Sequence, residues 1–289
     1  MTYQENENLR LAILIDAENI SPKYVALIMR EASVIGTLKY KKVYGNFAEG
    51  ALHSWERAIT ENAMIPVQQF NNTRGKNSSD SALIIDAMDL LYKGNVDAFC
   101  LVTSDSDFTR LATRLGEEEK YVVGMGERKT AKSFINACDR FVYLDLLLNQ
   151  ERKEKRAAQP ERSPRRGRRR SGEAETVVSE LAGQEAAELE AVELESAEVS
   201  EEGTNLETIK AAIAALIDEK SDDAGWLFSG VLGNLLNKRY PDFDVRNFGF
   251  KKFIPFITSL GCFEIQKRPS GEQNGVDLVY IRNIEESNA

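Results

Sequence analysis

Four aspartates in the first half of the chain have the positions that metal-assisted hydrolysis requires. Asp16 ends an apolar run, Asp105 and Asp107 directly follow another, and Asp80 stands at the start of a helix-like segment. Carboxylates gathered at one sheet edge repel one another unless a cation binds, and hard oxygen ligands suit Mg²⁺ or Mn²⁺. Such a cation makes a bound water more acidic and stabilises charge on a phosphate. We therefore predict a catalytic set of these four acids, with Asp16, Asp80 and Asp105 as the metal ligands.

Polar residues near these acids are predicted to assist them. Asn19 lies three residues after Asp16 and can orient a water or a phosphate without adding charge, so we include it in the catalytic set. Thr103 and Ser104 end the strand before Asp105 and are predicted to hydrogen-bond a carboxylate or the water. Asp86 lies further along the helix that begins at Asp80, and we predict a supporting role for it.

Each acid also has a purely structural alternative. Aspartate is a favoured N-cap, and both Asp80 and Asp105 stand where helices are predicted to begin. A cap explains poorly why Asp16 ends an apolar strand or why the acid is doubled at Asp105 and Asp107. We therefore favour a functional cluster.

A rival enzyme reading starts from residues 105–109, which spell D-x-D-x-T after an apolar strand. This resembles the nucleophile motif of haloacid-dehalogenase phosphatases, in which the first aspartate attacks phosphate covalently. That motif belongs on an early strand with a lysine and a further acidic pair after it. Here the motif instead lies late in the domain, shortly before the charged segment, and this position disfavours the phosphatase reading.

Composition limits the remaining chemistry. His53 is the only histidine, which limits serine–histidine, cysteine–histidine and two-histidine metal mechanisms, and we assign it no role. Cys100, Cys138 and Cys262 are widely spaced and form no CxxC pair, which argues against a disulfide framework or a thiolate zinc site. The polar first residues and the lack of a long apolar run predict a soluble, cytoplasmic protein with no membrane partner.

The residues before the charged segment alternate between strand-like and helix-like patterns, as a parallel α/β sheet requires. Ser21 and Pro22 provide the cap and first residue of a helix. We predict strands at 11–16, 38–47, 65–70, 97–104, 120–126 and 141–145, and helices at 21–34, 51–62, 80–93, 107–118 and 131–139. This pattern predicts a three-layer α/β domain over residues 1–148, in which ligands bind where the strands end.

Residues 149–203 are predicted to be a disordered linker because they lack aromatic residues and carry blocks of like charge. Residues 151–170 hold ten Lys or Arg against three Glu, and residues 171–202 hold eleven Glu with no Lys or Arg. The overall charge of −9 therefore hides a basic block. We predict RNA contacts from its arginines, Arg165, Arg166, Arg168, Arg169 and Arg170.

Residues 204–289 are predicted to form a small α+β winged-helix domain. Helical patterns cover 205–220, 227–241 and 249–260, and alternating residues around a polar loop predict a hairpin. We expect Phe243, Phe250 and Phe253 to pack in its core. Basic residues interleaved with aromatic ones are predicted to contact RNA: Lys238, Arg239, Arg246, Lys251 and Lys252.

The motifs LIDAENI, KNSSDSALIIDAMDLL, LVTSDSDFTRL and FINACDRFVYLD resemble the NYN family of PIN-like ribonucleases over about residues 9–147. This resemblance implies a PIN-like three-layer sandwich and divalent-metal-dependent RNA cleavage, with Asp16, Asn19, Asp80, Asp105 and Asp107 matching the acidic site. Asp86 matches a further recurrent acid. The loop before Asp80 is longer and more polar than the family pattern, and we assign its Lys76 to RNA.

The stretch PDFDVRNFGFKKF, within about residues 204–285, resembles the LOTUS domain, also called OST-HTH. This implies binding of RNA or of a protein partner. The combined reading is a metal-dependent ribonuclease targeted by an RNA-binding module. The alternative is an RNA-binding regulator whose nuclease-like domain is weak or inactive. The sequence leaves the oligomeric state open.

Overall fold

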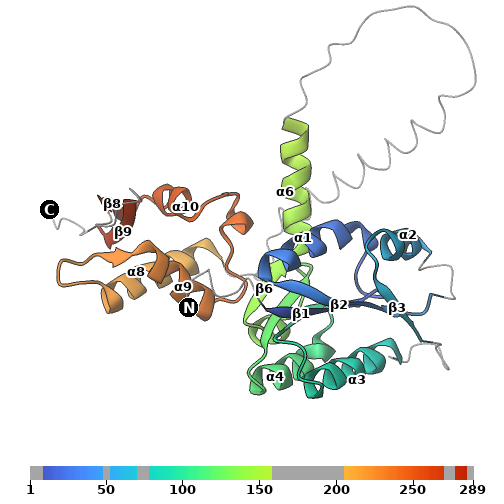
Figure 1. Ribbon diagram of the computed structural model, residues 1–289. Coiled ribbons are helices and arrows are strands. Elements are labelled where there is room, and N and C mark those ends of the chain that lie inside the picture. The colour runs from blue at the N-terminus through green and yellow to red at the C-terminus, as the bar shows by residue number, and fades with distance from the viewer. Residues whose placement is uncertain (1–8, 48–52, 70–77, 158–204, 270–276, 285–289) are drawn as a thin grey trace, which may run out of the picture. The chain divides into compact units, whose positions relative to one another are not determined.

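The computed structural model describes residues 9–47, 53–69, 78–157, 205–269 and 277–284 (Figure 1). The predicted RNA contacts at Lys76 and at Arg165, Arg166, Arg168, Arg169 and Arg170 lie outside these residues. Within them, no helix is long and apolar enough to cross a membrane.

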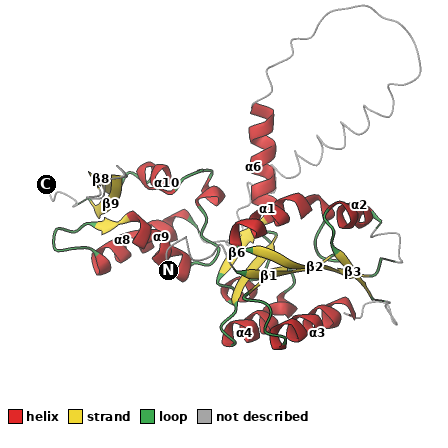
Figure 2. Ribbon diagram, viewed as in Figure 1, coloured by secondary structure: helices red, strands yellow, loops and turns green. Residues whose placement is uncertain are grey.

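A parallel sheet forms the centre of the N-terminal region (Figure 2). Its strands are β1 (Arg10–Asp16), β2 (Thr37–Gly45), β3 (Ile65–Gln68), β4 (Ala98–Val102), β5 (Tyr121–Gly126) and β6 (Arg140–Tyr143). They lie in the order β3-β2-β1-β4-β5-β6, and every neighbouring pair is parallel. From β1 the next strands, β2 and β3, are added on one side, and β4, β5 and β6 are added on the other side. The boundary between β1 and β4 is the topological switch point, where open α/β sheets bind ligands.

Helices cover both faces of this sheet (Figure 1). They are α1 (Val25–Ile35), α2 (Ser54–Glu61), α3 (Ser78–Tyr92), α4 (Thr109–Glu117), α5 (Lys132–Asn136) and α6 (Leu144–Ala157), with 3-10 turns at Pro22–Tyr24 and Ser106–Phe108. Alternate residues of β1 explain the two layers, since Ile13 packs with α1 and α2 whereas Leu14 packs with α3 and α4. The predicted three-layer α/β architecture is confirmed.

Several element boundaries differ from the predictions, and two of the differences have a clear local cause. Ser21 caps a 3-10 turn through the amide of Lys23, and the α-helix itself begins at Val25. Helix α6 continues to Ala157, inside the segment predicted to be a disordered linker. An acidic first turn and a basic last turn suit the helix dipole and favour this extension.

The C-terminal region has its own core. Its helices are α8 (Leu206–Lys220), α9 (Ser229–Arg239) and α10 (Phe253–Ser259), with a 3-10 turn at Val245–Phe248, and its antiparallel strands are β7 (Leu227–Phe228), β8 (Phe263–Pro269) and β9 (Asp277–Asn283) in the order β7-β9-β8. The pairing of β8 with β9 confirms the predicted hairpin. The predicted helix at 227–241 begins later because Leu227 and Phe228 pair with β9. The small α+β class is confirmed.

The three phenylalanines predicted to be core residues do pack there. Phe243, Phe250 and Phe253 are partly buried and lie against the C-terminal hydrophobic core. Phe243 and Phe250 have ring centroids 5.9 and 5.6 Å from that of Phe256, which is fully buried. Their rings therefore stabilise the domain.

Candidate active site

Asp16 is a buried carboxylate at the carboxyl end of β1, and only 1% of its surface is exposed. The backbone N–H groups of Glu18 and Asn19 donate to its Oδ1 at 3.1 and 3.2 Å. The Asn19 amide donates to Oδ2 at 2.7 Å, and the Thr103 hydroxyl donates to the same oxygen at 3.0 Å. Four donors from two chain segments thus fix the orientation of this carboxylate.

Burial and hydrogen bonding act on Asp16 in opposite directions. Desolvation raises the pKa of Asp16, and the hydrogen bonds from Asn19, Thr103 and Glu18 lower it in part. The net pKa stays above the usual value of an aspartate. A nearby positive charge would favour the ionised form of this buried acid.

Asp105 and Thr103 connect the end of β4 to Asp16. The backbone N–H of Asp105 donates to the Thr103 hydroxyl at 3.1 Å, and that hydroxyl in turn donates to Asp16. The Asp105 carboxylate caps the following 3-10 turn by accepting from the N–H of Asp107 at 2.9 Å. The structural alternative for Asp105 is therefore present, and it leaves the residue half-buried beside the end of β1.

Asp80 lies in the first turn of α3 and has acidic neighbours from other segments. Its pKa is raised to about 6, mainly by burial and then by the charges of Asp16, Asp105, Glu18 and Asp107 in that order. Carboxylates that shift one another's pKa must lie close together. The structure thus brings the predicted acids from β1, β4 and α3 into one electrostatic environment.

The oxygen atoms of these carboxylates, with polar side chains beside them, are ligands that suit a hard cation. Among the described residues, however, no group of three acids, cysteines or histidines lies close enough to hold a metal ion with the side chains as they stand. The site therefore fits a divalent cation in its negative charge and in its oxygen ligands.

Comparison with family models assigns both regions. Residues 10–145 match the NYN domain, and residues 204–274 match the OST-HTH/LOTUS domain. The chain combines an NYN domain with an OST-HTH/LOTUS domain. The NYN domain indicates a PIN-like nuclease family, and its parallel sheet covered by helices agrees with a PIN-like α/β sandwich. The OST-HTH/LOTUS domain suggests RNA binding.

A solved structure of a protein of unknown function from Vibrio parahaemolyticus is also similar. It shares 19% identity with a TM-score of 0.41, and the match covers 48% of this chain and 94% of that one. Comparison with curated proteins finds no match.

Asp86 of the NYN domain lies in a different set of contacts from the other acids. Its Oδ2 accepts from Lys42 Nζ at 2.7 Å and from the Tyr44 hydroxyl at 2.9 Å, and both partners belong to β2. Burial and then the charge of Asp86 raise the pKa of Tyr44, so this hydroxyl stays protonated and donates. Asp86 therefore ties α3 to the sheet, and its supporting role in the site stays a prediction.

Ser104 has a different partner from the predicted one. Its hydroxyl accepts from the backbone N–H of Glu127 at 3.0 Å, which joins the ends of β4 and β5. Thr103 alone of this pair contacts a carboxylate side chain among the described hydrogen bonds.

Two features of the NYN domain site were missed in the sequence. Glu18 adds a negative charge that raises the pKa of Asp80. Its position two residues after Asp16 is the sequence signal that could have identified it. Lys42 and Tyr44 carry no such signal, because only the pairing of β2 with its neighbours brings them to α3.

The basic candidates of the OST-HTH/LOTUS domain fall into two groups. Lys238, Arg239, Lys251 and Lys252 are exposed. Arg246 instead forms ion pairs with Asp244 and with Glu31 of the NYN domain. The guanidinium of Arg246 is thus already bound to carboxylates.

Proposed function

We propose that the protein is a divalent-metal-dependent ribonuclease that hydrolyses RNA phosphodiester bonds. The observation that carries this proposal is the gathering of acids around Asp80 of α3: burial raises the pKa of Asp80 most, and the charges of Asp16 at the end of β1 and Asp105 after β4 add to it. They lie at the switch point of the sheet, and the domain that holds them is an NYN domain.

Asp16, Asp80 and Asp105 are the residues that would hold Mg²⁺ or Mn²⁺. The cation, when bound, supplies an acidified water and stabilises the charge that develops on the phosphate. Asp107 adds negative charge beside Asp105. Asn19 and Thr103 orient the Asp16 carboxylate, so we revise the predicted role of Asn19 from water positioning to ligand positioning.

The OST-HTH/LOTUS domain would deliver RNA to this site. Lys238 and Arg239 end helix α9, and Lys252 directly precedes α10. Exposed cations of this kind contact phosphates without reading sequence. We therefore assign to this domain the binding of the RNA and to the NYN domain its cleavage.

The test is cleavage of labelled single-stranded and structured RNA by the full chain, with Mg²⁺ or Mn²⁺ against EDTA. Cleavage should require the metal and should fall by at least about 100-fold in Asp16→Asn and Asp105→Asn. Asp89→Asn, at an exposed position of α3, is the matched control and should cleave like the wild type. Equal cleavage by the wild type and both site variants would show that a contaminating nuclease is responsible and would refute the proposal.

A second candidate function is RNA binding without cleavage. It is favoured by the observation that no three described acids lie within range of a common ion. Binding of Tb³⁺, followed by its luminescence, separates the two functions without an activity assay. Metal binding that is lost in Asp16→Asn supports the nuclease, and RNA binding by a chain that binds no metal supports the regulator.

A further inference from the structure

Strand β6 is the edge of the NYN domain sheet, and a segment of the OST-HTH/LOTUS domain contacts its free side. We call this segment, residues 240–248, the docking segment. The backbone N–H of Phe141 donates to the Pro241 carbonyl at 2.7 Å, and the Tyr143 hydroxyl donates to Asp242 Oδ2 at 3.0 Å. The edge strand thus has partners on both sides.

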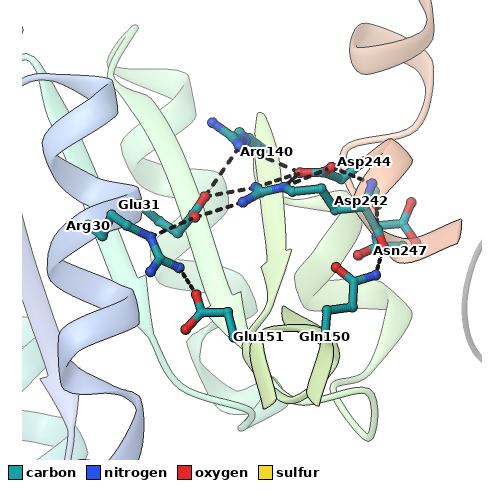
Figure 3. A network of polar contacts seen from close by, with 9 residues as sticks. Arg30, Glu31, Arg140, Gln150, Glu151, Asp242, Asp244 and Asn247 are labelled. Atoms are coloured by element: carbon teal, nitrogen blue, oxygen red, sulfur yellow. Dashed lines mark hydrogen bonds and ion pairs between the residues drawn. The ribbon is translucent and has the colours of Figure 1, made fainter. Parts of the chain in front are cut away.

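An ion-pair network lies beside this strand (Figure 3). Both terminal nitrogens of Arg246 donate to the two carboxylate oxygens of Glu31 in α1, each at 2.8 Å. Asp244 also accepts from Arg246, at 2.7 Å, and Arg140 lies 3.9 Å from both Glu31 and Asp244. Two arginines and two acids therefore alternate, and each domain supplies one of each sign.

The burial of Glu31 and Asp242 indicates that the contact with the docking segment is part of the fold. Glu31 is 6% exposed and Asp242 is 7% exposed. A buried carboxylate is costly unless it is paired and hydrogen-bonded, and a bidentate arginine provides both. Hydrogen bonding to Glu31 raises the pKa of Arg246, which stays charged. Without Arg246, the buried Glu31 would keep only the longer ion pairs with Arg30 and Arg140, each at 3.9 Å.

Helix α6 completes the contact. The Gln150 side chain donates to the Arg246 carbonyl, and Glu151 pairs with Arg30 beside Glu31 (Figure 3). The docking segment therefore contacts β6, α1 and α6 of the NYN domain. These three elements are far apart in sequence from the segment itself.

We propose that the docking segment is an intramolecular clasp that holds the OST-HTH/LOTUS domain on the β6 edge of the NYN domain. Arg246 then acts in domain docking, and the predicted RNA contact at this residue is replaced by the contact with Glu31. The complementary charges identify this chain's own NYN domain as the partner. In the sheet, β5 lies between β6 and β4, so the docking segment borders neither β1 nor β4.

The clasp can be tested by charge reversal in the full chain. We expect Glu31→Arg and Arg246→Glu each to increase amide hydrogen exchange in peptides covering 140–143 and 241–248 by at least about tenfold. The double reversal should restore most of the protection. Arg239→Glu, at an exposed position of the same domain, is the matched control and should change neither peptide.

Two further measurements keep the test decisive. Exchange in peptides covering β1 reports whether a variant has unfolded, and Asp242→Asn offers a milder change if Glu31→Arg does so. The molar mass by light scattering should be that of a monomer over a wide range of concentrations. Unchanged exchange in every folded variant would overturn the clasp, and protection that appears only in a dimer would assign the contact to a second copy and overturn the intramolecular form.

Discussion

The Thr103 hydroxyl shows how one polar atom can organise the site. It donates to Asp16 and accepts from the N–H of Asp105, so it connects the two strand ends at the switch point. Under the proposed function, a group in this position would set the orientation of the metal ligand Asp16 without contacting the metal.

We expect Thr103→Val to weaken divalent-metal affinity and cleavage by about 10–100-fold, because the Asp16 carboxylate loses a donor that fixes it. Isothermal titration with Mn²⁺ measures the affinity directly. Thr113→Val is the matched control, since the Thr113 hydroxyl donates only to the helix carbonyl of Thr109 among the described hydrogen bonds. Equal metal affinity in both variants would contradict the role of Thr103.

Asp80 makes stability depend on pH in a direction opposite to that of most carboxylates. Its pKa is raised from 3.8 to about 6, so the folded state favours the protonated form. The stabilisation is complete below the unfolded pKa and is lost as the pH rises through about 6.

Without divalent cations, we therefore expect Asp80→Asn to melt at a higher temperature than the wild type at about pH 8 and at a similar temperature near pH 4. Thermal denaturation followed by circular dichroism provides the measurement. Asp89→Asn, at an exposed position on the same helix, should follow the wild type at both values. A wild-type protein that is the more stable one at pH 8 would argue against crowding of negative charge around Asp80.

At the scale of elements, the contact of α3 with β2 decides where Asp80 lies. Asp86 accepts from Lys42 and Tyr44, and the three side chains anchor the helix to the second strand of the sheet. Removing the Asp86 carboxylate leaves the buried Tyr44 hydroxyl and the partly buried Lys42 ammonium without this acceptor.

We expect Asp86→Ala to lower the free energy of unfolding by about 1–3 kcal/mol. Asp89→Ala, on the same helix, should change it by less than about 0.5 kcal/mol. Urea denaturation of both variants gives the comparison. A cost for Asp86→Ala no larger than that for Asp89→Ala would mean that the contact with β2 does not hold the helix.

Elements with a strong local signal could be predicted from the sequence, and those set by distant partners could not. The apolar run at 11–16 identified β1, because a strand buried on both faces is apolar throughout. Asp16 and Asp105 could be placed together since parallel strands end at one edge. The two-residue strand β7 forms only through its pairing with β9, so its sequence alone resembled a helix start. Likewise, nothing near Glu31 in the sequence identifies Arg246 as its partner.

At the scale of the whole molecule, charge is distributed unevenly along the chain. The basic block before the acidic one gives a protein of charge −9 a strongly cationic stretch. Binding of RNA by such a stretch releases counterions and is therefore sensitive to salt.

We expect replacement of five arginines by glutamine to make RNA binding less dependent on salt; these are Arg165, Arg166, Arg168, Arg169 and Arg170. The slope of log affinity against log salt should become shallower by about 0.7 for each lost contact with single-stranded RNA. Fluorescence anisotropy over a salt series measures it. Replacing five glutamates of residues 171–202 by glutamine is the control and should not make the slope shallower. An unchanged slope in the arginine variant would exclude the basic block from binding.

Pro241 gives the sheet edge a further property. An edge strand with free N–H and carbonyl groups is a template on which other chains can add strands and aggregate. Pro241 accepts from the N–H of Phe141 but has no N–H of its own to continue a ladder. The docking segment, which covers the free edge of β6, therefore also stops further strands from adding to the sheet. Loss of this contact would expose an edge prone to fibre formation.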